Sequence, residues 1–456
     1  MRAKCSKRRD AGARRKSTLQ GSAKCSTSAR QVLDKHLVTA HAAYETFSFS
    51  HARRRTLAPH VVAVAALVLS MTVRPFPIAA LTFLCSLGTG ILWNALYFIA
   101  EREYGFTQRD SLLLAFLNGV LYTFVAMRAG PTVRFLERHM SARSALGLVL
   151  LVQAAMAPLV LIPSVAVLWV SAIAMTALGA LQWPIVQAYL AAGRHGADMR
   201  NAIGWWNASW MLATAIGLAL AGPLEAAQLT RWAIPMLLPV NLLALVFLAQ
   251  FPKRPASHDA HEQARHVPPT YRPLLAAARV LHPMGYLVIG ALSPILPFLF
   301  EKLATPASMQ APLGATWHVA RFLAVILLWQ TAFWHGRAAS LIAAGVLLTA
   351  GFACAVAAPN EWGIALGLFA LGLGQGTIYY SAIYYGLAVG AAEVDAGGIH
   401  EALVGAGYFM GPAIGLAVFS LGGSPSVFIG TVVGALCVGG VLAVVRGFRV
   451  KVPTVV

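Results

Sequence analysis

Long apolar stretches separated by short polar breaks dominate the chain from residue 78 onward. About 20 apolar residues in a helix cross a bilayer core about 30 Å thick. In lipid, a backbone must satisfy its hydrogen bonds inside helices or closed barrels. Each stretch is therefore predicted to be a transmembrane helix, and twelve are predicted: 78–100, 111–129, 143–163, 165–192, 203–222, 232–251, 284–302, 315–334, 338–358, 361–390, 402–422 and 425–445.

The longest polar break in this region, PKRPASHDAHEQARHVPPTYRPLLAAA at 252–278, falls between the sixth and seventh predicted helices. Its proline and charge content is typical of a linker. The pattern predicts an all-α membrane protein with two six-helix bundles. The predicted parts are a basic N-terminal tail (1–74), a first bundle (75–251), a linker (252–280), a second bundle (281–448) and a C-terminal tail (449–456).

Composition supports a membrane protein, because 58% of the residues are hydrophobic and only 11% are charged, whereas about 25% are charged in a soluble protein. The loops predict its orientation. If the first helix starts inside, the inner loops and the C-terminus carry fifteen Lys/Arg, and the outer side carries four. Positive loops stay cytoplasmic, so we expect both ends of the twelve-helix unit inside a cell (inner or plasma) membrane, and no nucleic-acid partner.

The first 70 residues differ from the rest, because they hold +11 of the net charge of +19 and are rich in Arg and Ser. A transit peptide and a disordered tail both fit this composition. The apolar run at 61–73 is too short to span a bilayer. We favour the hypothesis that Met71 is the natural start and that residues 1–70 are an upstream extension or a dispensable tail.

Two short sequences repeat in order in corresponding predicted helices. ALGALQWPI (177–185) matches ALGLGQGTI (370–378), which aligns Gln182 with Gln375, and AIGLAL (215–220) matches AIGLAV (413–418). The matches predict a duplicated six-helix unit in parallel orientation. The second match also aligns two stripes of small residues at steps of four, which permit close helix packing or a surface that slides between states: Ser209, Ala213, Gly217 and Gly407, Gly411, Gly415.

Twelve helices, a 6+6 duplication and cytoplasmic ends resemble the major facilitator superfamily over residues 75–450. The loop GPTVRFLERHMSAR (130–143) is similar to the family's G-x3-D-R-x-G-R-R loop, with Glu137 and Arg138 at the Asp-Arg positions, then Arg143, and without the central glycine. A G-x3-G-P-x2-G motif is formed by Gly407, Gly411, Pro412 and Gly415. It lies on the eleventh helix rather than the fifth, where the family's antiporters carry it, so antiport is not inferred.

The resemblance implies a secondary transporter for a small organic solute, working by alternating access around a cavity between helices 1, 4, 7 and 10. Polar side chains at membrane depth usually face such an interior, although Trp and Tyr also form interface belts and amides also join helices. Amides with aromatic faces suit a neutral or amphipathic solute. The predicted pathway residues are Trp93, Asn94, Tyr97, Gln182, Trp183, Gln187, Asn207, Trp210, Arg321, Gln375, Tyr379, Tyr380 and Tyr384.

Arg321 is the only Lys or Arg well inside a predicted helix, about 9 Å from its outer end. It suits an anionic group on the substrate, but snorkelling outward or pairing with Glu301 are alternatives. His318, one turn away, is a weaker candidate for proton coupling. No acid lies mid-membrane in the first six helices, so a coupling proton or ion stays open.

Acids gather in AAEVDAGGIHEALVGAGYFMGP (391–412), whose first part is predicted to be the inner loop between helices 10 and 11. A solvated loop is one interpretation. The other is an inner gate in which Glu393, Asp395 and Glu401 pair with Arg134, Arg138, Arg143 or Arg337, while Glu137 is attracted to the positive N-terminal end of helix 11.

Enzyme signatures are weak. His400-Glu401 begins an H-E-x-x-H pattern, but position 404 is Val, and neither GxSxG nor a P-loop occurs. The five cysteines have no metal or disulfide spacing. We therefore expect no enzyme, metal or cofactor, and a monomer whose partners are a small solute and the bilayer. A transporter-like sensor or scaffold, or less readily a multispan enzyme, remains the alternative.

Overall fold

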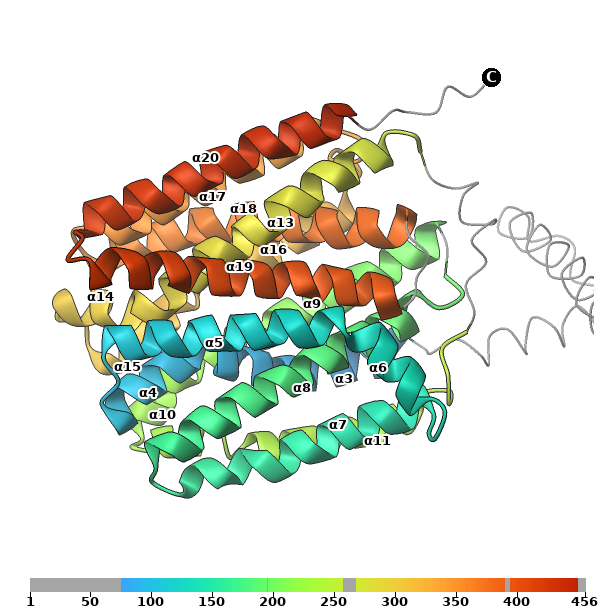
Figure 1. Cartoon of the computed structure of the whole chain (residues 1–456), viewed down its shortest axis with the longest axis horizontal. Helices are drawn as coiled ribbons and strands as arrows, with labels where there is room; N and C mark the ends of the chain where they lie inside the picture. The colour runs from blue at the N-terminus through green and yellow to red at the C-terminus, as the bar shows by residue number, and fades with distance from the viewer. Residues whose placement is uncertain (1–74, 195, 257–267, 390–393, 450–456) are drawn as a thin grey trace, which may run out of the picture. The chain divides into compact units, whose positions relative to one another are not determined.

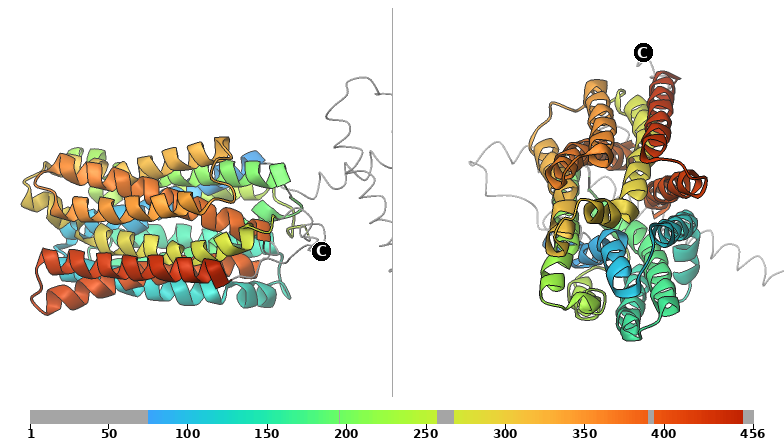
Figure 2. Two further views of the ribbon diagram at one scale, coloured as in Figure 1. Left: turned by 90° about the horizontal axis from the view of Figure 1, so that it is seen from above. Right: turned by 90° about the vertical axis from the view of Figure 1, so that its left-hand side faces the viewer.

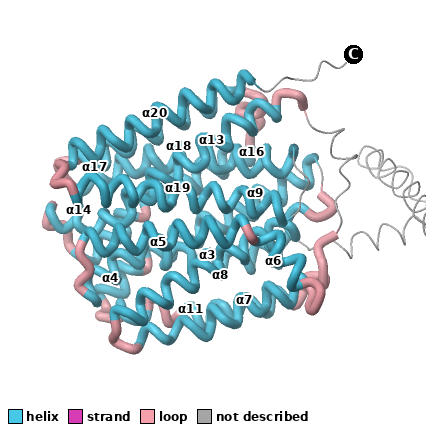
Figure 3. Tube along the Cα trace, in the orientation of Figure 1, coloured by secondary structure: helices cyan, strands magenta, loops and turns pink. Residues whose placement is uncertain are grey.

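The computed structural model describes residues 75–194, 196–256, 268–389 and 394–449, within the compact unit Val73–Val456. Every regular element in these ranges is a helix (Figure 3). Twelve helical segments among them are long and apolar enough to cross a membrane, which confirms the predicted number and the all-α class. Met71 and the tail before residue 75 lie outside the described residues, as do Glu393 and the middle of the linker.

The first six membrane-capable segments lie between residues 76 and 248. Their elements are α3 (Pro75–Gly90), η1 (Ile91–Ala95), α4 (Leu96–Tyr104), α5 (Gln108–Met127), α6 (Ala129–Leu136), α7 (Ala142–Met156), η2 (Ala157–Leu161), α8 (Val165–Ala191), α9 (Gly196–Ala219), α10 (Ala221–Ala226), η3 (Thr230–Trp232) and α11 (Leu237–Leu248). We call these elements the N-terminal half.

The other six segments lie between residues 271 and 447. Their elements are α13 (Tyr271–Leu292), η4 (Ser293–Ile295), α14 (Leu296–Lys302), α15 (Ala307–Gly314), α16 (Thr316–Gln330), α17 (Ala338–Ala357), α18 (Glu361–Val389), α19 (Val394–Ser420) and α20 (Pro425–Arg449). We call these elements the C-terminal half.

The two halves lie side by side (Figures 1 and 2). In Figure 1 the N-terminal half runs from blue to green and the C-terminal half from yellow to red. Helix α5 packs against α19, and α9 packs against α16. We call the end at which α11 finishes and α13 begins the linker end, and the other the opposite end.

Several helix boundaries differ from the sequence prediction, and those of the seventh and eighth helices bear on the site. The seventh segment begins at Tyr271 rather than at 284, because its first turns mix apolar residues with Arg272 and Arg279 and do not look like a span. The eighth runs from Ala307 to Gln330 rather than from 315 to 334. Arg321 therefore lies about 21 Å from one end and about 14 Å from the other, deeper than the predicted 9 Å.

Regular helix breaks at equivalent places in the two halves. Residues Ile91–Ala95 form a π-helix, a form that often marks functional sites. Residues Ser293–Ile295 form a 3-10 turn at Pro294, which cannot donate a backbone hydrogen bond. The two breaks meet, and the Ser293 hydroxyl donates to Oδ1 of Asn94 across 3.3 Å.

The two stripes of small residues pack on equivalent helices. A Cβ added at Gly217 of α9 would lie 2.6 Å from the carbonyl oxygen of Leu87 on α3. A Cβ added at Gly411 of α19 would collide with the carbonyl oxygen of Leu287 on α13. Because the first and fifth segments meet as the seventh and eleventh do, the packing accords with the repeat seen in the sequence.

Candidate functional site

A cavity lies between the two halves and is lined almost entirely by aromatic rings. We call it the central cavity. Its lining is Thr89, Trp93, Tyr122, Trp183, Trp206, Trp210, Tyr286, Tyr379, Glu401, Val404 and Tyr408, from α3, η1, α5, α8, α9, α13, α18 and α19. Its free volume of about 30 Å³ has space for a water molecule or two. In this conformation an organic solute does not fit.

Ring pairs across the halves hold the cavity closed. Trp93 of η1 stacks on Tyr408 of α19 with ring centroids 4.1 Å apart, and Trp210 of α9 stacks on Tyr379 of α18 at 5.0 Å. Such pairs add about 0.5–1.5 kcal/mol each beyond the area they bury.

Arg321 lies behind the aromatic wall of the central cavity. Its side chain is 1% exposed, and Nη2 donates to the Tyr286 hydroxyl across 2.8 Å. The guanidinium carbon lies 4.0 Å from the ring centroid of Trp210 and 4.9 Å from that of Tyr379. Because Tyr286 accepts from Arg321, the tyrosine proton remains free to donate to a group in the cavity.

Nothing neutralises this buried cation by direct pairing within the described part of the chain. No carboxylate there forms an ion pair with Arg321, and its Nε has no hydrogen-bond partner. Arg321 neither pairs with Glu301 nor reaches solvent. Both alternatives, pairing with Glu301 and snorkelling outward, are therefore wrong for this conformation. Cation–π contacts stabilise a desolvated cation by about 2 kcal/mol, which is less than the cost of burying a charge. These contacts therefore offset only part of the cost of burying the guanidinium.

Glu401 closes the cavity toward the linker end. Its carboxylate is 5% exposed and accepts one hydrogen bond from the Tyr122 hydroxyl at 2.6 Å and one from Nε2 of Gln187 at 2.5 Å. Both donors belong to the N-terminal half, whereas Glu401 belongs to α19. The carboxylate therefore joins the halves from inside the protein.

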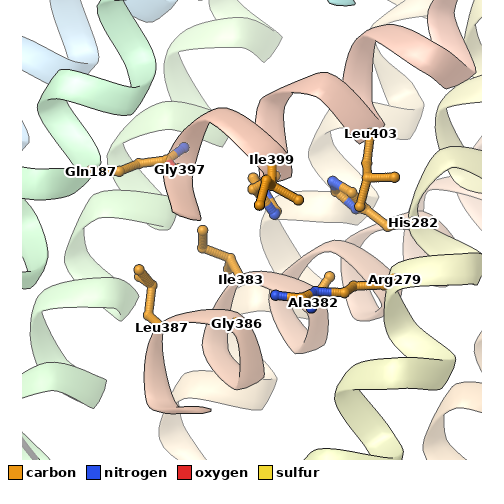
Figure 4. Close-up of a pocket in the computed structure, with 11 residues that line it drawn as sticks. Gln187, Arg279, His282, Ala382, Ile383, Gly386, Leu387, Gly397, Ile399 and Leu403 are labelled. Atoms are coloured by element: carbon orange, nitrogen blue, oxygen red, sulfur yellow. The ribbon is translucent and has the colours of Figure 1, made fainter. Parts of the chain in front are cut away.

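A second cavity lies on the linker side of Glu401, and we call it the linker-side cavity (Figure 4). Its free volume is about 20 Å³. Arg279 and His282 approach it from α13, and Gln187 approaches from α8 on the other side. The full lining is Gln187, Arg279, His282, Ala382, Ile383, Gly386, Leu387, Gly397, Ile399, His400 and Leu403.

At the opposite end, Arg102 of α4 joins the halves. Its Nη2 donates to the carbonyl oxygen of Ala307 at 3.0 Å and to Oε1 of Gln310 at 2.9 Å, both on α15. Its Nη1 lies 3.2 Å from the carboxylate of Glu225 in its own half. Contacts between the halves therefore exist on both sides of the central cavity.

The predicted pathway residues fall into three places. Trp93, Trp183, Trp210 and Tyr379 line the central cavity, and Arg321 touches its wall. Gln187 lines the linker-side cavity and bonds Glu401. The rest line neither: Asn94, Tyr97, Gln182, Asn207, Gln375, Tyr380 and Tyr384.

Several of these residues have structural partners instead. Gln182 lines a small cavity within the N-terminal half, and Gln375 packs beside Gly285. Asn207 donates to the Ile203 carbonyl of its own helix at 2.8 Å. Tyr380 and Tyr384 join a ring cluster around Trp334. Neither glutamine of the sequence repeat lines the central or the linker-side cavity in this conformation.

The predicted gate is partly assembled. Arg134 and Asp395 form an exposed ion pair across the halves. Glu401 pairs with no arginine among the described residues and is buried instead. Arg143 donates to the Phe251 carbonyl at 2.9 Å.

The other predicted gate residues form no ion pair between the halves among the described residues. Glu137 approaches Arg254 at 3.9 Å, and Arg337 precedes α17 and accepts from Ser340 through its carbonyl. Arg138 has no ion pair in the described part of the chain. Gly407 and Gly411 pack on α13, Pro412 is inside α19, and Gly415 faces Leu112 of α5.

Sequence reasoning missed four aromatic lining residues: Tyr122, Trp206, Tyr286 and Tyr408. A tyrosine inside an apolar helix is a signal that could have found Tyr122 and Tyr408. Tyr286 was not predicted, because the seventh helix was expected to start only two residues before it.

Comparison with known proteins tests the fold. No protein-family model matches the sequence. No curated protein matches it either. A solved structure, that of the human organic anion transporter MFSD10 (TETRAN), is similar with a TM-score of 0.57 and 14% identity, covering 85% of this chain and 100% of that one. The described chain is therefore a multi-pass membrane protein with the fold of the major facilitator superfamily, as its sequence resemblance predicts.

Proposed function

We propose that the protein is a secondary transporter that moves a small organic solute by alternating access. The observation that carries the proposal is the central cavity, lined from both halves and bounded at each side by contacts between them. A solute can reach such a cavity only if one set of contacts opens, and opening both at once would leave a pore. The loop charges favour a cytoplasmic linker end.

Arg321 supports an anionic group on the solute. The guanidinium is buried, paired with no described carboxylate, and bonded to a tyrosine hydroxyl whose proton can point into the cavity. Eight of the eleven lining residues are aromatic, which suits a flat or apolar body beside that group. The name of MFSD10, an organic anion transporter, accords with this class.

A binding screen followed by a flux measurement tests the proposal. Aromatic carboxylates and sulfonates, and matched amines and neutral analogues, are added to purified protein, since a bound ligand raises its melting temperature. We expect hits among the acids and flux of those hits into proteoliposomes. Binding without flux across the hits would favour a sensor and contradict transport.

Two arginine variants test the anionic group. We expect Arg321→Gln to weaken binding of the acids at least tenfold, about 1.4 kcal/mol. Arg128→Gln is the matched control, because Arg128 is exposed and also lies over a ring, 5.7 Å from the centroid of Phe124. Amine hits unaffected by Arg321→Gln would refute the anionic class while leaving transport intact.

A further inference from the structure

The linker-side cavity gathers groups that can bind an anion. Its charged or titratable lining consists of Arg279, His282 and His400, and no carboxylate lines it. The imidazole rings of His282 and His400 stack with centroids 4.3 Å apart. Arg279 is exposed at the edge of this cavity, whereas His282 is 1% exposed.

Polar atoms around this cavity lack partners. Both ring nitrogens of His282, Nε2 of His400 and Oε1 of Gln187 have no hydrogen-bond partner among the described residues. No described residue forms an ion pair with Arg279 either. A buried polar atom left unbonded costs about 1–3 kcal/mol. Each neutral imidazole carries one N–H donor, so two imidazoles and a guanidinium offer several donors to one small acceptor.

The cavity lies one ring layer from the central cavity. His282 packs against Tyr286 at 5.2 Å and Tyr379 at 5.5 Å between centroids, and both tyrosines line the central cavity and touch Arg321. Glu401 and Gln187 separate the two spaces. Cationic groups thus stand on both sides of one buried carboxylate.

We propose that Arg279, His282 and His400 form a second anion-binding site on the linker side of Glu401. One oxygen of a carboxylate, sulfate or phosphate group enters the cavity beside the imidazoles, and the rest of the group lies at its edge beside the exposed Arg279. Its role as a station for the solute's anionic group rests on the proposed function, but its binding of an anion does not.

Sulfate is the probe, with chloride at equal ionic strength as the reference anion, because chloride lacks the carboxylate, sulfate or phosphate oxygens that the site is proposed to bind. Melting temperatures are measured on purified protein in a detergent free of anionic lipid. We expect sulfate to raise the melting temperature of the wild type by about 2 °C over chloride. The rise should fall by more than half in Arg279→Ala and in His282→Asn.

Arg272→Ala is the matched control, because Arg272 is exposed on the same helix and does not line the cavity. It should keep the full rise. An equal rise in all four proteins would mean an adventitious ion only and would overturn the site. Loss of the rise in Arg321→Gln, with retention in Arg279→Ala, would place the sulfate in the central cavity and also overturn it.

A lipid headgroup offers the same chemistry as free sulfate, and nanodiscs distinguish the two sources. If phosphatidylglycerol in phosphatidylcholine nanodiscs stabilises the protein through Arg279 and removes the sulfate effect, the site holds a lipid phosphate. If sulfate acts in phosphatidylcholine alone and phosphatidylglycerol adds nothing, the site takes a free anion. Flux is not measured here, so a failure of this site and a failure of transport give separate results.

Discussion

The side-chain amide of Gln187 donates to Oε1 of Glu401 across 2.5 Å, and this bond joins α8 of the N-terminal half to α19 of the C-terminal half. The Tyr122 hydroxyl donates a hydrogen bond to the other carboxylate oxygen of Glu401. Hydrogen bonds to a charged group are worth about 1.5–3 kcal/mol each. A conformation with the halves parted at the linker end loses both bonds, so Glu401 favours the closed state.

Replacing Glu401 should therefore open the linker end. We expect Glu401→Ala to raise the labelling rate of a single cysteine placed at Leu403, beside the linker-side cavity, by about tenfold. Labelling is measured in membranes with a thiol reagent on a cysteine-free background. Glu103→Ala is the control, because Glu103 is exposed on α4. Equal labelling in the two variants would show that the buried carboxylate does not hold the halves together.

Asp395 provides a graded comparison on the same helix. Its ion pair with Arg134 is exposed on both sides, and such pairs contribute about 0–1 kcal/mol. We expect Asp395→Asn to raise labelling at Leu403 by no more than a few-fold, clearly less than Glu401→Ala. The reverse order would make the surface pair, rather than the buried carboxylate, the main inner contact.

The helices were predictable because each must present about 20 apolar residues to lipid. The role of Glu401 was not predictable. The sequence pattern placed Glu401 in a loop, where it was expected to pair with surface arginines. In the structure α19 begins at Val394, so Glu401 lies inside the helix. Its carboxylate faces inward and accepts from Tyr122 and Gln187. Hydropathy counts apolar residues and does not record which way a polar side chain at a helix end points.

The central cavity shows a similar limit. Trp93 and Trp210 were predicted as pathway residues because aromatic faces at membrane depth suit an organic solute, and both line the central cavity. Gln182 and Gln375 were favoured because they repeat, yet Gln182 lines a small cavity inside the N-terminal half and Gln375 packs beside Gly285 of its own half. A helix face is set by rotation about its axis, and a repeat in sequence fixes equivalence without fixing that rotation.

The opposite end should respond to Arg102. Arg102→Ala removes two hydrogen bonds to α15 of the other half, so we expect the opposite end to open. A single cysteine at Gly314, which faces Phe98 across the halves, should label several-fold faster. Arg109→Ala, an exposed arginine near the same end, is the control. Slower labelling at Gly314, or no change, would contradict a closing role for Arg102.

At Gly411, α19 approaches the backbone of α13 so closely that a larger side chain does not fit. An added methyl group would meet the Leu287 carbonyl oxygen and the Ala291 nitrogen, which are backbone atoms that cannot turn away. Overpacking costs about 1–3 kcal/mol or more, so Gly411→Ala should lower the melting temperature by several degrees. Gly430→Ala is the matched control, because nothing lies within 4 Å of its added methyl. A loss of the same size in both variants would contradict the close approach at Gly411 as its cause.

His335, between α16 and α17, should make stability depend on pH. Its Nδ1 lies 2.9 Å from the Tyr271 hydroxyl, and burial, with Arg200 nearby, lowers the pKa of its imidazole below the usual value of about 6.5. The unfolded chain therefore binds a proton first as pH falls below about 6.5, and the folded state loses stability down to its own lower pKa. We expect the fall in melting temperature between pH 7.5 and 5.5 to be smaller in His335→Asn than in the wild type. His139→Asn, at an exposed histidine, should keep the wild-type slope; a matching reduction there would remove His335 as the cause.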